Sequence, residues 1–505
     1  MKSLNPAGVR NKNGRQKVEK KGLLSKDTLK RVSLLIAFSS ILNLIILKIP
    51  YSIEEVIGTF LLISLLLIIL YKDVLRYKPS IKDNYNTLLL LGILLIGNFV
   101  IGMAFLYVFE GFVRWLGKIG PDVVIYAIPL ATGSMLAALL IDIHTAIVFT
   151  VITSLISGLW LNNPVYSLFI FALGITSAFS VIRCKRRSAI WRAGIFVSLV
   201  AVAMSIIMLL LKGVLFRLET GIVIMVAFSN GIVVAMLVSA ILPLLEYLFK
   251  ITTDISLLEL LDLDHPLMRQ LLLEAPGTYH HSIVVGNLVE SAAEAVGVNP
   301  LLARVGAYYH DIGKIKMPEY FIENQVVPVS KHDALTPHMS SLILISHVKE
   351  GVELAKQHKL PKEIIDIIQQ HHGTSIQTYF YEKAKELHEK DPTVPIFEDD
   401  FRYPGPKPKS RVAALILMAD AVEAASRVLT DPTPSRVSAL VERIINHCFI
   451  DGQLDECELT LKDIREIKIY FVYLLTSMYH KRIDYPGFEI RDEDTHKEPA
   501  KAKTS

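Results

Sequence analysis

The chain has 505 residues, an apolar fraction of 52% and a formal net charge of only +4. This apolar fraction is higher than the core of a soluble protein requires, so the composition excludes a chain that is soluble or disordered throughout and indicates membrane spans. The three cysteines, Cys184, Cys448 and Cys457, lack paired spacing, which excludes a disulfide framework and a thiolate zinc site.

The first predicted element is a basic arm, residues 1–32, in which ten lysines and arginines are opposed only by Glu19 and Asp27. A basic flank before an apolar segment keeps that end of the chain in the cytoplasm and lets it contact anionic lipid. We prefer this interpretation to the binding of a nucleic-acid polymer, which we do not expect. A cleaved signal peptide is disfavoured, because no small-residue cleavage site follows the first apolar segment.

Residues 33–250 are predicted to form a transmembrane domain of eight helices, since about 20 apolar residues cross a bilayer as a helix. The eight segments are residues 33–49, 53–71, 87–109, 122–141, 145–161, 165–182, 194–211 and 221–246. Basic residues gather in the loops at residues 72–82 and 183–192, on the same side as the arm. The positive-inside rule therefore predicts a multi-pass protein of the bacterial inner membrane, with the N-terminus and the chain after residue 250 in the cytoplasm.

Polar side chains are scarce within the eight segments, where Asn98 and Asn230 are the main candidates for burial. Transporters need intramembrane charges to bind substrates or protons, so this scarcity disfavours a transport function.

Residues 251–483 are predicted to form a soluble domain of short helices, which makes the whole chain all-α. Helices begin at proline, as at Pro300 and Pro361, and end at glycine, as at Gly313 and Gly373. Pro276 and Gly277 are expected to end one helix, with Thr278 as the cap of the next. No alternating strand pattern is present. Residues 484–505 have no apolar periodicity and are expected to be a disordered tail.

A constellation of histidine and aspartate is the main chemical signal of this domain. In chain order its members are His281, His310, Asp311, His347, His371, His372 and Asp420. Imidazole nitrogen and carboxylate oxygen together suit divalent iron, manganese or zinc. Asp420 is the acid that we single out in the apolar helix predicted over residues 412–425, where an unpaired carboxylate is costly. Each histidine alone is typical of a solvated helix end, but together the seven residues predict a metal site.

The order His, His-Asp, His, His-His, Asp, with the element HDIGK at residues 310–314, is that of HD-superfamily phosphohydrolases. Further segments are APGTYHHS, LLARVGAYYHDIGK and ENQ within residues 275–325, SHVKEGVELA at 346–355, HHGT at 371–374, FRYPGPKP at 401–408 and LDECELTLKDI at 454–464. With these segments, the chain resembles the seven-transmembrane HD family, whose PgpH-type members hydrolyse cyclic di-AMP. In that family an extracellular domain follows the first span; here the connection at residues 48–52 is too short for one.

The resemblance implies two divalent metal ions, with iron or manganese expected. One metal would take His281, His310, Asp311 and Asp420, and the other would take Asp311, His347, His371 and His372, so that Asp311 bridges them. His280 is left out, because adjacent residues on a helix cannot share a face.

Three residues are interpreted as partners of the substrate. Lys314 is expected to offset charge on a phosphate oxygen, or else to be a surface lysine after a helix end. Arg402 and Tyr403 are plausible contacts to phosphate or base, by the guanidinium fork and the ring face, or they only pack their loop.

The resulting hypothesis is a membrane-anchored phosphodiesterase that hydrolyses cyclic di-AMP to pApA. Two alternatives stay open: an HD hydrolase for another nucleotide, and a receptor that binds nucleotide without turnover. The expected partners are a cyclic dinucleotide and the lipid bilayer, and homo-oligomerisation is left open.

Overall fold

The computed structural model describes residues 26–47, 51–77, 85–116, 121–182, 184, 186–217, 219–325, 330–390, 395–429 and 431–479. This part of the chain is helical and contains no strand, apart from an isolated bridge between Ile376 and Arg402. The predicted all-α fold class is therefore confirmed. Most of the basic arm, and the whole of the predicted tail at residues 484–505, lie outside the described residues.

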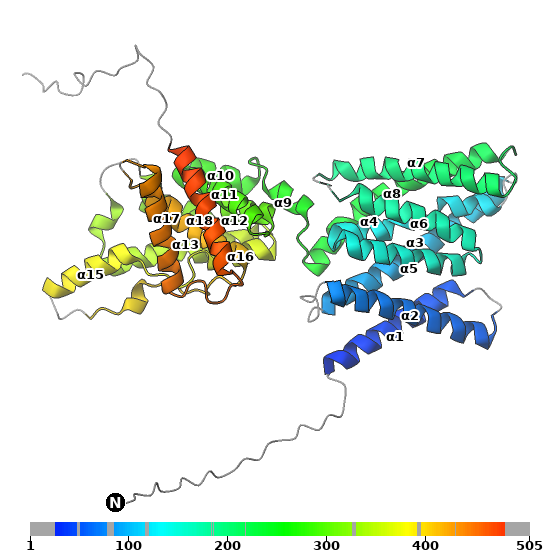
Figure 1. Cartoon of the computed structure of the whole chain (residues 1–505), viewed down its shortest axis with the longest axis horizontal. Coiled ribbons are helices and arrows are strands. Elements are labelled where there is room, and N and C mark those ends of the chain that lie inside the picture. Colours follow the sequence, from blue (N-terminus) through cyan, green and yellow to red (C-terminus); the bar gives the residue numbers. More distant parts are fainter. Residues whose placement is uncertain are drawn as a thin grey trace, which may run out of the picture. The chain divides into compact units, whose positions relative to one another are not determined.

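The chain divides into two compact units, residues 1–249 and 250–505. The first unit contains α1 (Lys26–Ile46), α2 (Ile53–Tyr77), α3 (Tyr85–Leu116), the short 3-10 helix η2 (Pro121–Ala127), α4 (Ala131–Leu140), α5 (Ile143–Trp160), α6 (Pro164–Ser180), α7 (Ser188–Leu211) and α8 (Thr220–Phe249) (Figure 1). Seven helical segments are long and apolar enough to cross a membrane, whereas α6 is apolar but has only 17 residues. The count of eight spans therefore stays a prediction.

The fourth apolar segment, which the sequence presents as continuous, is broken between η2 and α4. Asn98 on α3 holds this break, because its Nδ2 donates to the Leu130 carbonyl at 2.8 Å and its Oδ1 accepts from the Gly133 amide at 3.1 Å. Asn230 on α8 donates to the carbonyls of Tyr126 and Ile128 at 2.9 and 3.0 Å. Backbone groups freed by a break must find partners inside the protein when no water reaches them. The two buried asparagines therefore have a structural role.

The second unit is a bundle of short helices. It contains α9 (Asp254–Leu260), α10 (Pro266–Glu274), α11 (Pro276–Ala295), α12 (Pro300–Tyr309), η3 (Ile312–Lys316), η4 (Pro318–Tyr320), η5 (Ile322–Asn324), η6 (Lys331–Ala334), α13 (Pro337–Gln357), α14 (Lys362–Gln370), α15 (Thr378–Lys390), η7 (Glu398–Phe401), α16 (Arg411–Ser426), α17 (Pro434–Ile450) and α18 (Leu461–Met478). Proline stands at the first or second position of α10, α11, α12, α13 and α17, as the sequence predicts for several of them.

The predicted break between two helices is present, since α10 ends at Glu274, but Thr278 is not the cap of the next helix: α11 already begins at Pro276 and has no side-chain cap. Gly277 is therefore helical, and its role is close approach: a Cβ at this position would collide with the backbone carbonyl of Glu323. The glycine lets the loop at residues 317–325 pack against the start of the helix that carries His281.

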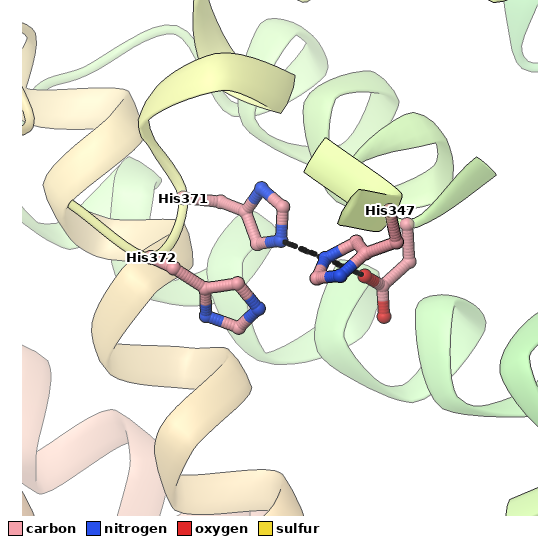
Figure 2. Close-up of side chains that lie close together, drawn as sticks. His347, His371 and His372 are labelled. Atoms are coloured by element: carbon pink, nitrogen blue, oxygen red, sulfur yellow. Dashed lines mark hydrogen bonds and ion pairs between the residues drawn. The ribbon is translucent and has the colours of Figure 1, made fainter. Parts of the chain in front are cut away.

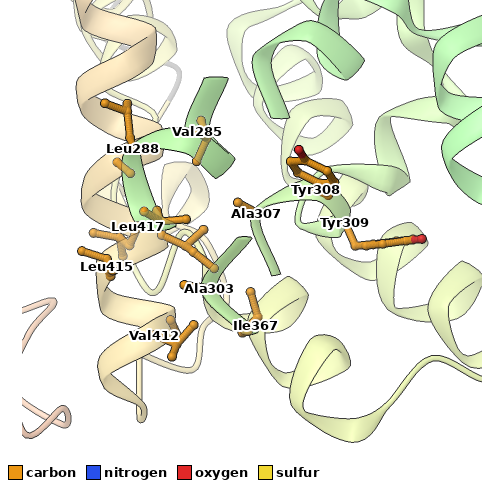
Figure 3. Close-up of a cluster of buried hydrophobic side chains, with 14 of the residues drawn as sticks. Val285, Leu288, Ala303, Ala307, Tyr308, Tyr309, Ile367, Val412, Leu415 and Leu417 are labelled. Carbon is orange, nitrogen blue, oxygen red and sulfur yellow. The ribbon is translucent and has the colours of Figure 1, made fainter. Parts of the chain in front are cut away.

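Helix α16 is the centre of the second unit, with twelve buried residues among its 16. Figure 3 shows Val412, Leu415 and Leu417 of this helix among the side chains of the core, to which Leu288 of α11 also belongs. A helix that is apolar on nearly all sides is typical of a buried element. Any charged residue on α16 therefore needs a partner within the fold.

Candidate metal centre

The seven predicted metal ligands come together in the second unit. They lie on or beside α11 (His281), the end of α12 (His310, Asp311), α13 (His347), the end of α14 (His371, His372) and α16 (Asp420). Their ligand atoms form two groups, each with all its atoms within 4.8 Å of one another: His281, His310 and Asp420; and Asp311, His347, His371 and His372. All seven are buried except His372, which is partly buried, whereas the neighbouring His280 is exposed.

Asp311 lies between the two groups and turns one carboxylate oxygen to each. Its Oδ2 is 3.2 Å from His310 Nε2 and 3.7 Å from His281 Nε2. Its Oδ1 is 3.3 Å from His347 Nε2 and 3.5 Å from His371 Nε2, and Figure 2 shows these two rings facing each other. The side chain is 1% exposed. A carboxylate with this placement is suited to contact two cations at once.

Gly313 explains how Asp311 reaches α13. A Cβ on Gly313 would collide with the backbone carbonyl of His347 and would also crowd the amide of Gly351. Only a residue without a side chain lets η3 lie directly against this helix. The glycine of the HDIGK element therefore sets the distance between Asp311 and His347.

Three of the histidines are oriented by the backbone of their own chain segment. The Nδ1 atoms of His310, His347 and His371 lie 2.7, 2.5 and 2.7 Å from the carbonyl three residues earlier. A carbonyl only accepts hydrogen bonds, so Nδ1 must carry the proton and donate it. In its neutral form each ring then turns the Nε2 lone pair to the centre, in the tautomer that a metal ligand needs.

His281 is oriented differently, by a carboxylate that the sequence analysis missed. Its Nδ1 lies 2.5 Å from Oε2 of Glu423, which is 4% exposed. The other oxygen of Glu423 accepts from Nε and Nη2 of Arg427 at 2.7 and 2.6 Å. Besides Asp420, α16 thus brings a second acid to the cluster. The signal for Glu423 was present, since it stands three residues after Asp420 and on the same face of the helix.

Lys314 lies at the edge of the centre between two carboxylates. Its Nζ is 2.7 Å from Asp311 Oδ2 and 2.8 Å from Glu323 Oε1, and the side chain is 13% exposed. Burial alone lowers the pKa of the ammonium, but the charges of Asp311 and Glu323 raise it above its ordinary value. Glu323 also accepts a hydrogen bond from Thr278 Oγ1 at 3.1 Å. Lys314 is therefore a partly buried cation of the centre and not a surface lysine.

The pKa values of the ionisable groups in the centre shift in different directions, according to the neighbours of each group. Burial opposes ionisation of Asp311, but His310 and Lys314 beside it hold its pKa well below its usual range. Burial also lowers the pKa of His310, yet the negative charge of Asp311 beside it raises it to about 10. The pKa of His371 falls to about 4, mainly through burial. Protons on the histidines near the acids thus balance the carboxylates when no cation is bound.

The donor atoms fit divalent metal ions. Nε2 of His281, Nε2 of His310 and Oδ1 of Asp311 are buried without a hydrogen bond of good geometry, although ionisable partners lie within 3.8 Å. Buried polar atoms without partners are rare unless a ligand supplies the missing contact. Nitrogen and carboxylate oxygen, with no cysteine, match iron, manganese or zinc. The cluster is therefore compatible with divalent metal binding.

Of Arg402 and Tyr403, the two residues predicted to contact phosphate or base from the Pro-rich segment, the structure brings Tyr403 to the centre. Its ring stacks on that of His372 with centroids 4.2 Å apart, and Gln377 donates a hydrogen bond to its hydroxyl. The guanidinium of Arg402 instead donates to Glu398 at 2.6 and 3.0 Å and to the Thr374 carbonyl at 2.9 Å. These hydrogen bonds hold the guanidinium of Arg402 against its own loop.

An all-α unit with these ligands in this order, including an adjacent His-Asp pair at the end of one helix, defines the HD class of metal-binding domains. The family described as "HD domain" matches residues 278–425, and the family described as "7TM receptor with intracellular HD hydrolase" matches residues 53–253. The chain therefore belongs to the seven-transmembrane HD family. Its apolar helices and this membership make it a multi-pass membrane protein.

Two curated relatives and a solved structure are similar to the chain. It is 37% identical over 492 residues to "Cyclic-di-AMP phosphodiesterase PgpH" of Bacillus subtilis (strain 168), covering 96% of this chain and 66% of that protein. It is 40% identical over 367 residues to the protein of the same name from Listeria monocytogenes serotype 1/2a (strain 10403S), covering 72% and 50%. The crystal structure of the L. monocytogenes PgpH HD domain shows 46% identity over 43% of this chain and 100% of that one, with a TM-score of 0.41. The chain thus spans half to two thirds of the length of these curated relatives.

Proposed function

We propose that this protein is a metal-dependent phosphodiesterase that hydrolyses cyclic di-AMP to the linear dinucleotide pApA. The observation that carries the proposal is the pair of ligand groups that share Asp311. Such a shared carboxylate is expected of a dinuclear hydrolase. A domain that only bound nucleotide would have no chemical need for seven converging ligands, which argues against the receptor alternative.

The proposed ligand sets follow the two oxygens of Asp311. His281, His310, Asp311 and Asp420 would hold one divalent ion, and Asp311, His347, His371 and His372 would hold the other. The distances of 3.2 to 3.7 Å from Asp311 to four of the histidines support this division. Iron or manganese is the proposed metal for both positions, since both accept mixed nitrogen and oxygen ligands.

The chemistry at the centre is hydrolysis of one of the two phosphodiester bonds of the ring. Two bound cations would polarise the phosphate and lower the pKa of a shared water. Lys314 is proposed to place positive charge beside a nonbridging phosphate oxygen, which its position 2.7 Å from Asp311 Oδ2 supports. Tyr403, stacked on His372, is proposed to present a ring face to the substrate. Arg402 is proposed to act indirectly, by holding the loop that carries Tyr403.

The choice of substrate is based on the names of the curated relatives, because the metal ligands do not distinguish one nucleobase from another. The full-length protein, purified in detergent and loaded with iron or manganese, is incubated with cyclic di-AMP, cyclic di-GMP or pApA. Cyclic di-AMP should be consumed with pApA as the product, and Asp311→Asn should abolish this reaction. Asp264→Asn, at an exposed position of the same unit, is the matched control and should retain it.

Other outcomes of the same experiment separate the alternatives. Preferential hydrolysis of cyclic di-GMP or of pApA would show an HD hydrolase with another substrate. Binding of cyclic di-AMP without product, at full metal content, would show a receptor and overturn the enzymatic proposal.

We further propose that α1 to α8 form eight spans, which place the N-terminus and the HD unit in the cytoplasm. The family match over residues 53–253 contains seven of these helices, α2 to α8, including the short α6. Basic residues in the loops at residues 72–82 and 183–192 support the orientation. Reporter fusions at residue 505 test it: activity of a periplasmic reporter at the C-terminus would contradict this topology.

A further inference from the structure

A groove of about 300 Å³ lies between α1 and α2 in the membrane unit. Its walls include the apolar side chains of Ile36 on α1 and Ile68 on α2, which are 52% and 44% exposed. One end is lined by Arg31, Tyr71 and Lys72. The groove thus joins an apolar surface, at the level of the spans, to a polar and basic end.

Among the described residues, the basic end of the groove has a hydroxyl partner. Arg31 Nη1 donates to the Tyr71 hydroxyl at 3.2 Å, which fixes the guanidinium across the two helices. Within the described part of the chain, neither Arg31 nor Lys72 forms an ion pair with a carboxylate. The adjacent Asp73 is occupied by His144, at 2.8 Å. Within the part of the chain that the structure describes, these two cationic side chains therefore have a hydroxyl and no carboxylate as a partner.

A polar atom also lies inside the groove. Ser64 lines it, and its hydroxyl is buried without a hydrogen-bond partner. A hydroxyl in an apolar wall is costly unless an acceptor reaches it. Snorkelling of basic residues at helix ends explains exposed charges, but it explains neither the concavity nor this hydroxyl.

We propose that the groove binds one molecule of an anionic phospholipid. Arg31 and Lys72 bind the phosphate, the apolar walls hold an acyl chain, and the Ser64 hydroxyl donates to an ester carbonyl. A planar guanidinium with several donors is well suited to phosphate oxygens. Basic pockets between membrane helices are sites of this kind. Free phosphate is the weaker occupant, because it would leave the apolar walls uncovered.

The test uses native mass spectrometry of the full-length protein, released from micelles that contain phosphatidylglycerol or phosphatidylcholine. We expect one retained phosphatidylglycerol and no comparable retention of phosphatidylcholine, and inorganic phosphate should not displace the lipid. The double variant Arg31→Gln with Lys72→Gln should weaken retention of phosphatidylglycerol on the order of thirtyfold, because two basic contacts to the lipid are lost. Ile68→Trp, which fills the groove and keeps both charges, should also remove the bound lipid.

The matched control is Arg192→Gln with Arg217→Gln, which removes the same charge elsewhere in the unit and should retain the lipid. Equal retention of the two lipids, equal losses in the two double variants, or displacement by inorganic phosphate would each overturn the proposal. So would full retention in Ile68→Trp, because the lipid would then lie outside the groove. Circular dichroism of each variant shows that the helices are intact.

Discussion

Glu423→Gln tests whether the carboxylate behind His281 tunes the metal centre. The native carboxylate accepts from His281 Nδ1 through one oxygen and from Arg427 through the other, at 2.5 and 2.6–2.7 Å. An amide has a single oxygen, so the glutamine must turn an NH₂ group toward one of these two donors. Because Glu423 is 3% exposed, no solvent replaces the lost acceptor.

The expected loss of metal affinity follows from the role of the Glu423 carboxylate as the acceptor that orients His281. Removing such an outer carboxylate costs about 10- to 100-fold in metal affinity or activity, which corresponds to about 1.4–2.7 kcal/mol. The assay measures turnover against free metal concentration, together with metal content after dialysis. We expect the metal concentration for half-maximal activity to rise by this factor, with partial rescue by excess metal.

Glu290→Gln is the matched control for this prediction. Glu290 lies on α11, and its Oε2 is 2.9 Å from Nη1 of Arg304, so the substitution breaks an ion pair away from the centre. Exposed pairs of this type contribute about 0–1 kcal/mol, so activity and metal dependence should stay unchanged. If Glu423→Gln kept its metal dependence within twofold of the parent while losing only thermal stability, the carboxylate would be a packing residue and the reasoning would be refuted.

Three further predictions concern the fold and the protons of the centre. Gly313→Ala should cost about 1–3 kcal/mol and lower metal content, because its Cβ meets the His347 carbonyl; denaturant unfolding measures the loss. Asn98→Ala should destabilise the membrane unit by about 1–2 kcal/mol, read from its thermal midpoint in detergent. Metal binding should release protons and tighten as pH rises toward 10, because the pKa of His310 is about 10 without metal and only the neutral ring binds; calorimetric heats that do not depend on the buffer would contradict this.

The clustering of several of the proposed ligands could be anticipated, because these residues are tied to a local signal. His310 and Asp311 end the helix that begins at Pro300, and the structure places that end at the centre. His371 and His372 follow α14 in the same way, before Gly373 with its positive φ of 53°. Residue type and the proline and glycine residues that begin and end helices are properties of short segments, so they can be identified directly in the sequence.

The break in the fourth apolar segment could not be predicted, because hydropathy does not distinguish one helix from two pieces. The residues that decide it are far away: Asn98 and Asn230 lie about 30 and 100 positions from the carbonyls that they bind. Both were recognised as buried polar candidates, but their partners depend on packing between helices. Long-range partners of this kind become visible only in the fold.

Arg402 shows why residue type alone is a weak guide to substrate contacts. A guanidinium fork is suited to phosphate, but here Glu398 four residues earlier supplies the carboxylate instead, at 2.6 Å. Tyr403 was equally uncertain and lies against His372. The difference arises because adjacent residues of an extended segment point in opposite directions.

The charges of the centre lead us to expect that this unit folds before metal binds. Asp311 and Asp420 are buried, and a buried carboxylate without a counter-charge would be severely destabilising. Lys314 and the raised pKa values of His281 and His310 supply that counter-charge from the chain itself. A bound cation then replaces protons that are already present, so that binding changes the chemistry of the centre more than its architecture. This arrangement differs from a structural zinc site, in which metal binding supplies the folding energy.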